Sequence, residues 1–252
     1  MSTFKFNEFG AIIIGEEILS GKRQDKHLNY IISTLKKRGL KLNWSFFLRD
    51  EPKEIEKVLY SCFRQKVNVF CFGGIGATPD DHTRQAAAKA LNVELKLHKD
   101  AEKKIVSKFK ESAYPHRINM GVFPKGAKII DNPYNNIPGF TIKNIYFFPG
   151  FPEMAWPMMD LILDNNFNIQ KKIIERDYSV DVFNIGESFL IPTMKQIMKT
   201  YPNVYVYSLP TAKTKDLKIE IGVKGQIPDI SKAFSLLKKL LDKNDFKWKS
   251  NN

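Results

Sequence analysis

The sequence predicts an α/β protein with a mainly parallel sheet and helices on both faces, followed by a small C-terminal α+β domain. Short apolar runs alternate with segments whose apolar residues recur at helical spacing, which is the pattern of βαβ units. An Asn-rich stretch at residues 164–168 then separates this pattern from a β-α-β-β-α order. The chain is therefore expected to form two domains, residues 1–168 and 169–252.

The first part of the chain carries the clearest alternation of strands and helices. Its strands are continuous apolar runs, as expected for strands covered on both faces. Gly39 supplies the left-handed residue that commonly ends a helix. The expected elements are a strand at 9–15, a helix around 28–35, a strand at 42–48, a helix at 55–62 and a strand at 67–72.

The rest of the chain continues less regularly. Residues 114–140 are rich in Pro, Gly and Asn and predict an ordered loop with short strands. The apolar run 145–148 enters the turn that begins at Pro149–Gly150, either a second ligand-binding turn or a plain connection. The other expected elements are a strand at 93–97, a helix at 105–109, strands at 178–183, 204–208 and 217–223, a helix after Gly186 and a helix at 230–241.

A glycine-rich turn follows the third strand and is the most informative local feature. Gly73, Gly74 and Gly76 permit positive φ and a close approach of backbone amides to a ligand. Thr78 and Pro79 suit the N-cap and first position of a helix, whose free N–H groups and dipole favour a phosphate. The pattern therefore predicts a phosphate-binding turn at the carboxyl end of a strand.

Two adjacent carboxylates complicate this prediction. Asp80 and Asp81 would repel a bare phosphate unless a cation lay between them, and Mg²⁺ held by one or two carboxylates and phosphate oxygens would resolve the conflict. The alternative is structural, because Thr78 and Asp81 have the spacing of a capping box.

Composition indicates a globular protein that is not embedded in a membrane. Of 252 residues, 43% are hydrophobic and 27% charged, and no apolar run is long enough to span a bilayer. The N-terminus does not resemble a signal peptide, so we expect a cytoplasmic protein. The net charge of +13 is spread along the chain, more typical of a solvated surface than of a binding footprint. Cys62 and Cys71 are expected to be buried, reduced thiols.

Four motifs together resemble a known family. They are GGIGATPDD with the following HTR, GEEILSG at 15–21, NPYNNIPGF at 132–140 and FPGFPEM at 148–154. In this order they resemble the molybdopterin-binding (MoaB/Mog-like) domain, which is also found at the N-terminus of CinA (competence/damage-inducible protein A) proteins and in eukaryotic FAD synthases. The resemblance covers about residues 5–165 and is closest to the CinA group.

The resemblance implies a site for a pterin or nucleotide phosphate. Asp50 and Asp81 match the family's catalytic acids, and Asp80 and Asp81 are the expected Mg²⁺ ligands. The remaining expected ligand-binding residues are Gly15, Glu17, Gly73, Gly74, Gly76, Thr78, Pro149 and Gly150. The segment after residue 170 is similar to the KH-like domain of CinA proteins. The amidase domain that ends those proteins has no counterpart here, so amidase activity is not expected.

The chain departs from the family's pattern near the first loop. Gln24–Asp25–Lys26–His27 stands where CinA relatives are Asn-rich. Asp25 is expected to cap the next helix, with a ligand role as the alternative. Lys22, Arg23, Lys26 and His27 are expected near the mouth of the site, where they would contact phosphates.

Three functions remain open on the sequence. The first is binding of molybdopterin or a nucleotide, with Mg²⁺. The second is metal-dependent hydrolysis of a pyrophosphate such as ADP-ribose. The third and weakest is RNA binding, since Gly222–Val223–Lys224–Gly225 matches the loop of KH modules but follows a strand, which favours an ordinary turn. The expected partner is a small phosphorylated molecule, not a membrane or nucleic acid, and a homo-oligomer is compatible with the sequence.

Overall fold

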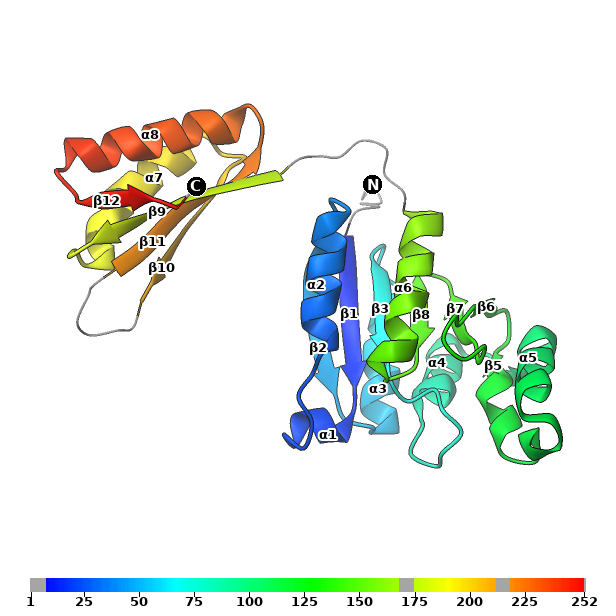
Figure 1. Ribbon diagram of the computed structural model, residues 1–252. Coiled ribbons are helices and arrows are strands. Elements are labelled where there is room, and N and C mark those ends of the chain that lie inside the picture. The colour runs from blue at the N-terminus through cyan, green and yellow to red at the C-terminus, as the bar shows by residue number, and fades with distance from the viewer. Residues whose placement is uncertain (1–7, 168–174, 212–217, 252) are drawn as a thin grey trace. The chain divides into compact units, whose positions relative to one another are not determined.

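The computed structural model describes residues 8–167, 175–211 and 218–251, which divide between two compact units, residues 1–170 and 171–252 (Figure 1). Residue 168, after which the domain boundary was predicted, lies outside the described residues. The first unit contains β1 (Glu8–Ile14), α1 (Glu16–Leu19), α2 (His27–Lys37), β2 (Lys41–Leu48), α3 (Pro52–Phe63), β3 (Asn68–Phe72), α4 (Thr83–Leu91), β4 (Leu95–Leu97), α5 (Lys99–Phe109), β5 (Val122–Pro124), β6 (Lys128–Ile130), β7 (Gly139–Ile142), β8 (Ile145–Phe148) and α6 (Pro152–Asn166).

A six-stranded sheet forms the centre of the first unit. Its strand order is β2-β1-β3-β8-β7-β6. Strands β2, β1, β3 and β8 are parallel, and β7 pairs antiparallel with both β8 and β6. The chain leaves β1 for β2 on one side and returns to β3 on the other, so the order reverses at β1 and β3. This reversal is the topological switch point, where open α/β sheets bind ligands.

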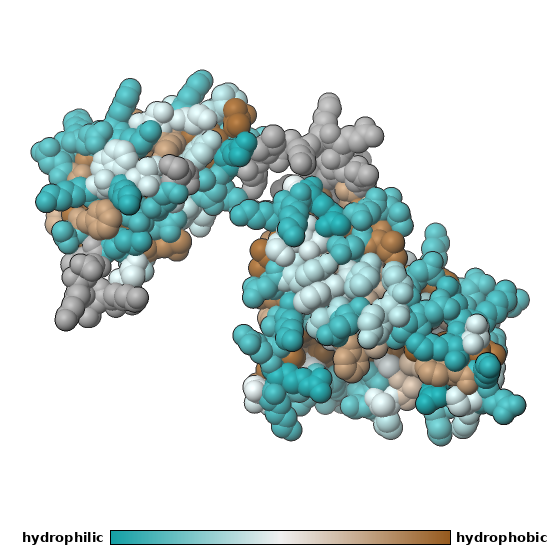
Figure 2. Space-filling view, in the orientation of Figure 1, coloured by the Kyte–Doolittle hydropathy of each residue, from teal (hydrophilic) through white to brown (hydrophobic). Residues whose placement is uncertain are grey.

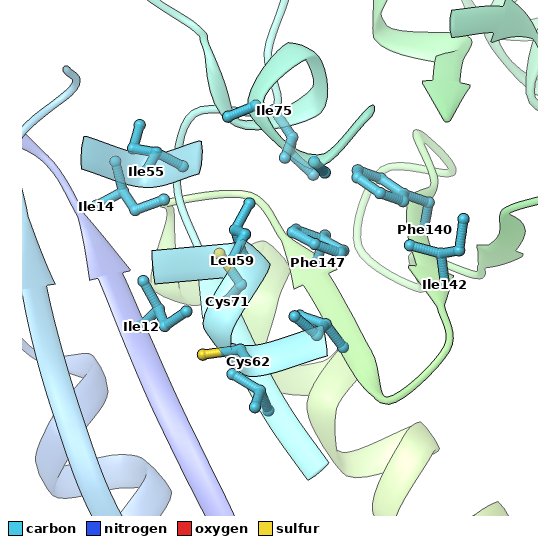
Figure 3. Close-up of a cluster of buried hydrophobic side chains, with 14 of the residues drawn as sticks. Ile12, Ile14, Ile55, Leu59, Cys62, Cys71, Ile75, Phe140, Ile142 and Phe147 are labelled. Atoms are coloured by element: carbon cyan, nitrogen blue, oxygen red, sulfur yellow. The ribbon is translucent and has the colours of Figure 1, made fainter. Parts of the chain in front are cut away.

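Alternate residues of β1 enter two separate cores. Ile12 and Ile14 pack with Ile55 and Leu59 of α3, on the face seen in Figure 3. The opposite face of the strand packs on α2 and α6 through the cluster that contains Phe9, Ala11, Ile13, Ile31, Leu35, Ala155 and Met158. Because both faces are covered, the strand has no polar side, as its apolar run predicted. The predicted α/β class with a mainly parallel sheet is confirmed.

The two cysteines are buried, as predicted. Cys62 lies on α3 and Cys71 on β3, and both thiols are free. Burial raises the pKa of Cys62 to about 11. At neutral pH this thiol therefore stays protonated and unreactive.

The second unit is a four-stranded antiparallel sheet covered by helices. Its strands, in the order β10-β11-β9-β12, are β9 (Glu175–Phe183), β10 (Tyr205–Pro210), β11 (Lys218–Gln226) and β12 (Trp248–Ser250), and its α-helices are α7 (Ile191–Thr200) and α8 (Asp229–Lys243). The β-α-β-β-α order was predicted, but β12 was missed. Gly222 and Gly225 lie inside β11, paired with Ser179 and Arg176 of β9, so the predicted strand-end turn at these glycines is wrong.

The surface visible in Figure 2 is mostly hydrophilic, and its hydrophobic side chains form small separate patches. In the described parts of the chain, no helix combines the length and apolar character needed to cross a membrane.

Candidate functional site

A cleft of about 740 Å³ opens at the carboxyl ends of β1, β3 and β8. All the residues predicted as catalytic, metal-binding or ligand-binding line it. These residues are Gly15, Glu17, Asp50, Gly73, Gly74, Gly76, Thr78, Asp80, Asp81, Pro149 and Gly150. Three of the four motifs meet there because parallel strands end at the same edge of the sheet, whereas the motif at 132–140 contributes no lining residue. The cleft lies at the switch point between β1 and β3.

Gly73 and Gly74 form the floor of the glycine turn. Their φ angles are +99° and +66°, as predicted, whereas Gly76 does not have a positive φ. A Cβ on Gly73 would lie 2.3 Å from the Ile14 carbonyl oxygen, and one on Gly74 would lie 2.2 Å from Thr83 Oγ1. At Gly73 and Gly74, therefore, both the backbone conformation and the available space require glycine.

The predicted start of the following helix is wrong. Helix α4 begins at Thr83, not at Pro79. Thr78 instead belongs to a tight turn in which its N–H and Oγ1 donate to Asp81 Oδ2 at 2.9 and 2.6 Å, and the Asp81 N–H donates to the Thr78 carbonyl at 3.0 Å. Thr78 and Asp81, which have the spacing of a capping box, thus bond to each other within a turn and not at the start of a helix. These bonds hold Asp81 at the cleft.

Thr83 and Arg84 support the glycine turn from behind. The buried Thr83 hydroxyl donates to the Gly73 carbonyl at 3.0 Å, and the backbone N–H of Thr83 donates to the Gly74 carbonyl. Arg84 is 4% exposed and donates to the carbonyls of Gly76, Asn119 and Val122. We did not predict either role from the sequence, although both residues belong to the HTR motif that follows the turn.

The first loop brings a further carboxylate to the same cleft. Asp50 follows β2, and its Oδ2 accepts a hydrogen bond of 2.8 Å from the N–H of Glu16, at the start of α1. The N–H of Gly15 donates to the Leu48 carbonyl at 3.0 Å, which extends the pairing of β1 and β2. These bonds hold Glu17 and Asp50 on one wall of the cleft.

The cleft is strongly acidic although the protein carries a net positive charge. Two cations, Arg23 and Lys26, line it, whereas Lys22 is not among the lining residues. The lining carboxylates are Glu17, Asp25, Asp50, Asp80, Asp81 and Glu153. A phosphate entering this cleft would require a cation to offset the repulsion.

The pKa of Asp50 is raised mainly by burial and further by the neighbouring carboxylates. Burial raises the pKa, the hydrogen bond from the Glu16 N–H opposes the increase, and the charges of Glu17, Asp80 and Asp81 raise the pKa further. A carboxyl whose folded-state pKa exceeds its unfolded value binds its proton more tightly in the folded protein. Its contribution to stability is therefore lost as pH rises through the folded-state pKa.

Replacing Asp50 by asparagine is expected to stabilise the protein at pH 7. Asparagine keeps an oxygen that can accept from the Glu16 N–H, but it removes one of the mutually repelling charges. Urea unfolding at several pH values should show the largest gain in the free energy of unfolding, relative to wild type, above the folded-state pKa of Asp50. This gain should shrink as the pH falls. A variant less stable than wild type at pH 7 would contradict the assigned repulsion.

Asp25 caps α2, as the first of the two alternatives predicted. Its Oδ1 and Oδ2 accept hydrogen bonds from the N–H groups of His27 and Leu28 at 2.9 and 3.0 Å. Beside it, His27 is buried against Phe72, with ring centroids 4.6 Å apart, and its Nε2 lies 2.9 Å from the Gly150 carbonyl. This contact ties α2 to the turn that follows β8, which forms the opposite wall of the cleft.

His27 is neutral near physiological pH. Burial lowers its pKa, and the Gly150 carbonyl and the charges of Asp25 and Glu153 only partly oppose this effect. A neutral ring that donates from Nε2 leaves Nδ1 unprotonated, and Nδ1 is buried with no partner among the described residues.

No group of three or more His, Cys, Asp or Glu side chains in the described residues is arranged to hold a metal ion by itself. The arrangement of Asp81 still suits a cation shared with a ligand. Thr78 occupies Oδ2 of Asp81, and within the described chain Oδ1 accepts no hydrogen bond. The roles of Asp80 and Asp81 as metal ligands stay predictions.

Fold and cleft together define an open α/β protein of the class that binds ligands at a sheet switch point. The chain belongs to the family of probable molybdopterin binding domains, whose model matches residues 10–168. The family predicted from the four motifs is thereby confirmed.

Relatives extend the similarity over most of the chain. A protein of Caldivirga maquilingensis is 33% identical over 228 residues, which cover 85% of this chain and 87% of that protein. A CinA-like protein of Fusobacterium nucleatum is 28% identical over 239 residues, covering 93% of this chain but 58% of the relative. The crystal structure of the protein CinA of unknown function from Thermoplasma acidophilum covers 63% of this chain and 97% of that structure, with a TM-score of 0.58 and 25% identity.

Proposed function

We propose that the cleft binds a phosphorylated pterin or nucleotide, with Mg²⁺ between the phosphate and Asp81. The observation that carries this proposal is that a glycine-rich turn and six carboxylates line one cleft at the switch point. Backbone N–H groups of a glycine-rich turn can bind a phosphate, and the six carboxylates repel one unless a divalent cation accompanies it.

In this proposal the glycines bind the phosphate and the carboxylates bind the cation. Gly73, Gly74 and Gly76 would lie against the phosphate, and Arg84 keeps the turn in place through the Gly76 carbonyl. Asp81, assisted by Asp80, would hold Mg²⁺. The cation would neutralise phosphate charge, and phosphate oxygens would complete its coordination.

A second candidate is hydrolysis of a pyrophosphate such as ADP-ribose in the same cleft. The raised pKa of Asp50 favours it, because a more basic carboxylate is a better general base. Asp50 would accept a proton from water while the water oxygen bonds to phosphorus, and the bond from phosphorus to the bridging oxygen would break. The products would be two phosphate monoesters.

Calorimetric titration with ADP-ribose, FAD, ATP and molybdopterin analogues tests both candidates. In the presence of Mg²⁺ we expect Asp81→Asn to weaken binding at least about tenfold, because the main carboxylate that holds the cation loses its charge. Chelation with EDTA should weaken wild-type binding to a similar degree. Chromatography of the mixtures then separates binding alone from turnover.

The matched control is Asp100→Asn, which removes an exposed carboxylate of α5 that does not line the cleft. It should bind like wild type. Binding or turnover that survives Asp81→Asn would rule out the metal role of Asp81, and salt-sensitive RNA binding would instead support the nucleic-acid hypothesis.

A further inference from the structure

Strand β2 forms a long open edge of the six-stranded sheet. It stands first in the strand order and pairs with β1, whereas β6, at the other edge, is three residues long (Figure 1). Edge strands of native proteins usually avoid association by being short or by carrying charges or proline. β2 has eight residues, no proline and one charge, that of Lys41 at its start. Its edge is therefore open to pairing with another strand.

The regular part of β2, Trp44–Leu48, directs backbone groups to this edge. It follows an irregularity in the pairing with β1. The Leu48 carbonyl accepts from the Gly15 N–H at 3.0 Å and so faces β1. Successive residues of a strand direct their N–H and C=O groups to opposite sides. Ser45 and Phe47 therefore direct theirs to the open edge.

An apolar ring lies at the middle of the same segment. Phe46 is 46% exposed, and its ring packs on Trp44 with centroids 5.0 Å apart and an interplanar angle of 38°. Trp44 in turn fills the space beside Gly10 of β1, where an added Cβ would lie 2.1 Å from the indole. Phe46 is thus supported by packing on one side, while nearly half of it remains exposed at the edge strand.

We propose that a second copy of this chain pairs with β2 in antiparallel orientation, about a two-fold axis at Phe46. This register uses the whole regular segment, because Phe46 is its middle residue. Ser45 of each copy then faces Phe47 of the other, and each such pair exchanges both backbone hydrogen bonds. The two Phe46 rings meet across the axis, where opposite side chains lie close together.

The flanking charges favour this register over the neighbouring one. Lys41 of one copy would lie near Glu51 of the other, whereas an axis moved to Ser45 would bring Lys41 near Arg49 instead. Each copy offers the β2 edge once, so pairing about a two-fold axis closes at a dimer and does not continue into a fibre. The inference does not depend on which ligand the cleft binds.

Light scattering after size-exclusion chromatography, over a concentration series, tests the oligomeric state. Wild type should have twice the 29.1 kDa mass of the chain. Phe46→Lys should be monomeric at concentrations at which wild type is dimeric, because it places like charges opposite each other and removes the aromatic pair. The matched control is Tyr134→Lys, which makes the same change at a 61% exposed ring between β6 and β7 and should remain dimeric.

Single cysteines test the register independently. Phe46→Cys places two thiols on directly opposite residues, with Cα atoms about 4.5 Å apart and so within reach of a disulfide. Mild oxidation should therefore give a covalent dimer on a non-reducing gel. In Asn43→Cys the two thiols are offset along the strands by roughly 20 Å, so no covalent dimer should form. The native Cys62 and Cys71 are buried and do not compete.

A wild type that stays monomeric throughout the series would overturn the proposal and leave the edge to a strand of another protein. A dimer that persists in Phe46→Lys would place the contact on another surface and overturn it as well. A covalent dimer from Asn43→Cys but not from Phe46→Cys would have the same consequence. Thermal unfolding shows whether Phe46→Lys is folded, and if it is not, the two cysteine variants decide.

Discussion

Gly73→Ala is expected to abolish ligand binding in the cleft and to lower the free energy of unfolding by about 3 kcal/mol. Alanine must adopt a φ of +99°, and its Cβ would lie 2.3 Å from the carbonyl oxygen of Ile14. Relief requires movement of β1 or of the glycine turn, both of which line the cleft. Urea unfolding and titration with ADP-ribose measure the two effects.

Gly126→Ala separates the clash from the backbone strain. Gly126 has a φ of +90°, no atom lies within 4 Å of a Cβ built there, and the residue does not line the cleft. This control should lose only about 1 kcal/mol, the cost of the strained φ alone, and bind normally. Equal losses of stability in Gly73→Ala and Gly126→Ala would show that the contact with Ile14 is relieved without cost.

The sheet of the first unit could be predicted because the sequence of each strand alone identifies it as a buried strand. The runs that became β1, β3 and β8 are apolar on both faces, and the segments between them have helical spacing. Strand β12 could not be found in this way. It is three residues long and exists because Trp248, Lys249 and Ser250 pair with β9, far away in the sequence.

The glycine turn shows where local pattern stops being decisive. Thr78 and Asp81 have the spacing of a helix cap, and they do form hydrogen bonds with each other. The same bonds can close a turn, and the start of α4 is instead set by Thr83, which bonds the turn at Gly73 and Gly74. Which residue begins the helix thus depends on tertiary contacts that the spacing does not encode.

The sequence predicted residues that line the candidate site, but it did not predict the residues that hold the glycine turn in place. Glycines and carboxylates that follow predicted strands indicate ligand-binding residues by their type alone. The family motifs add Pro149 and Gly150. Arg84 gives no such signal, since an arginine in a helix is ordinarily solvated. Its importance follows from burial and from three carbonyl partners, two of which lie 35 and 38 residues away.

Arg84→Leu is accordingly expected to lower the free energy of unfolding by about 3 kcal/mol, because three carbonyls lose their donor in a buried setting. The turn should also loosen at Gly76, which weakens binding of ADP-ribose although Arg84 does not line the cleft. Urea unfolding and calorimetric titration give the two values.

Arg84→Lys distinguishes the geometry of the guanidinium from its charge. Lysine keeps the positive charge near Asp81, but a single ammonium group cannot reach carbonyls that a planar fork bonds on two sides. If the fork positions the turn, Arg84→Lys should lose most of the stability that Arg84→Leu loses. If the charge near Asp81 matters instead, Arg84→Lys should resemble wild type, and the turn would then depend on electrostatics and not on the three hydrogen bonds.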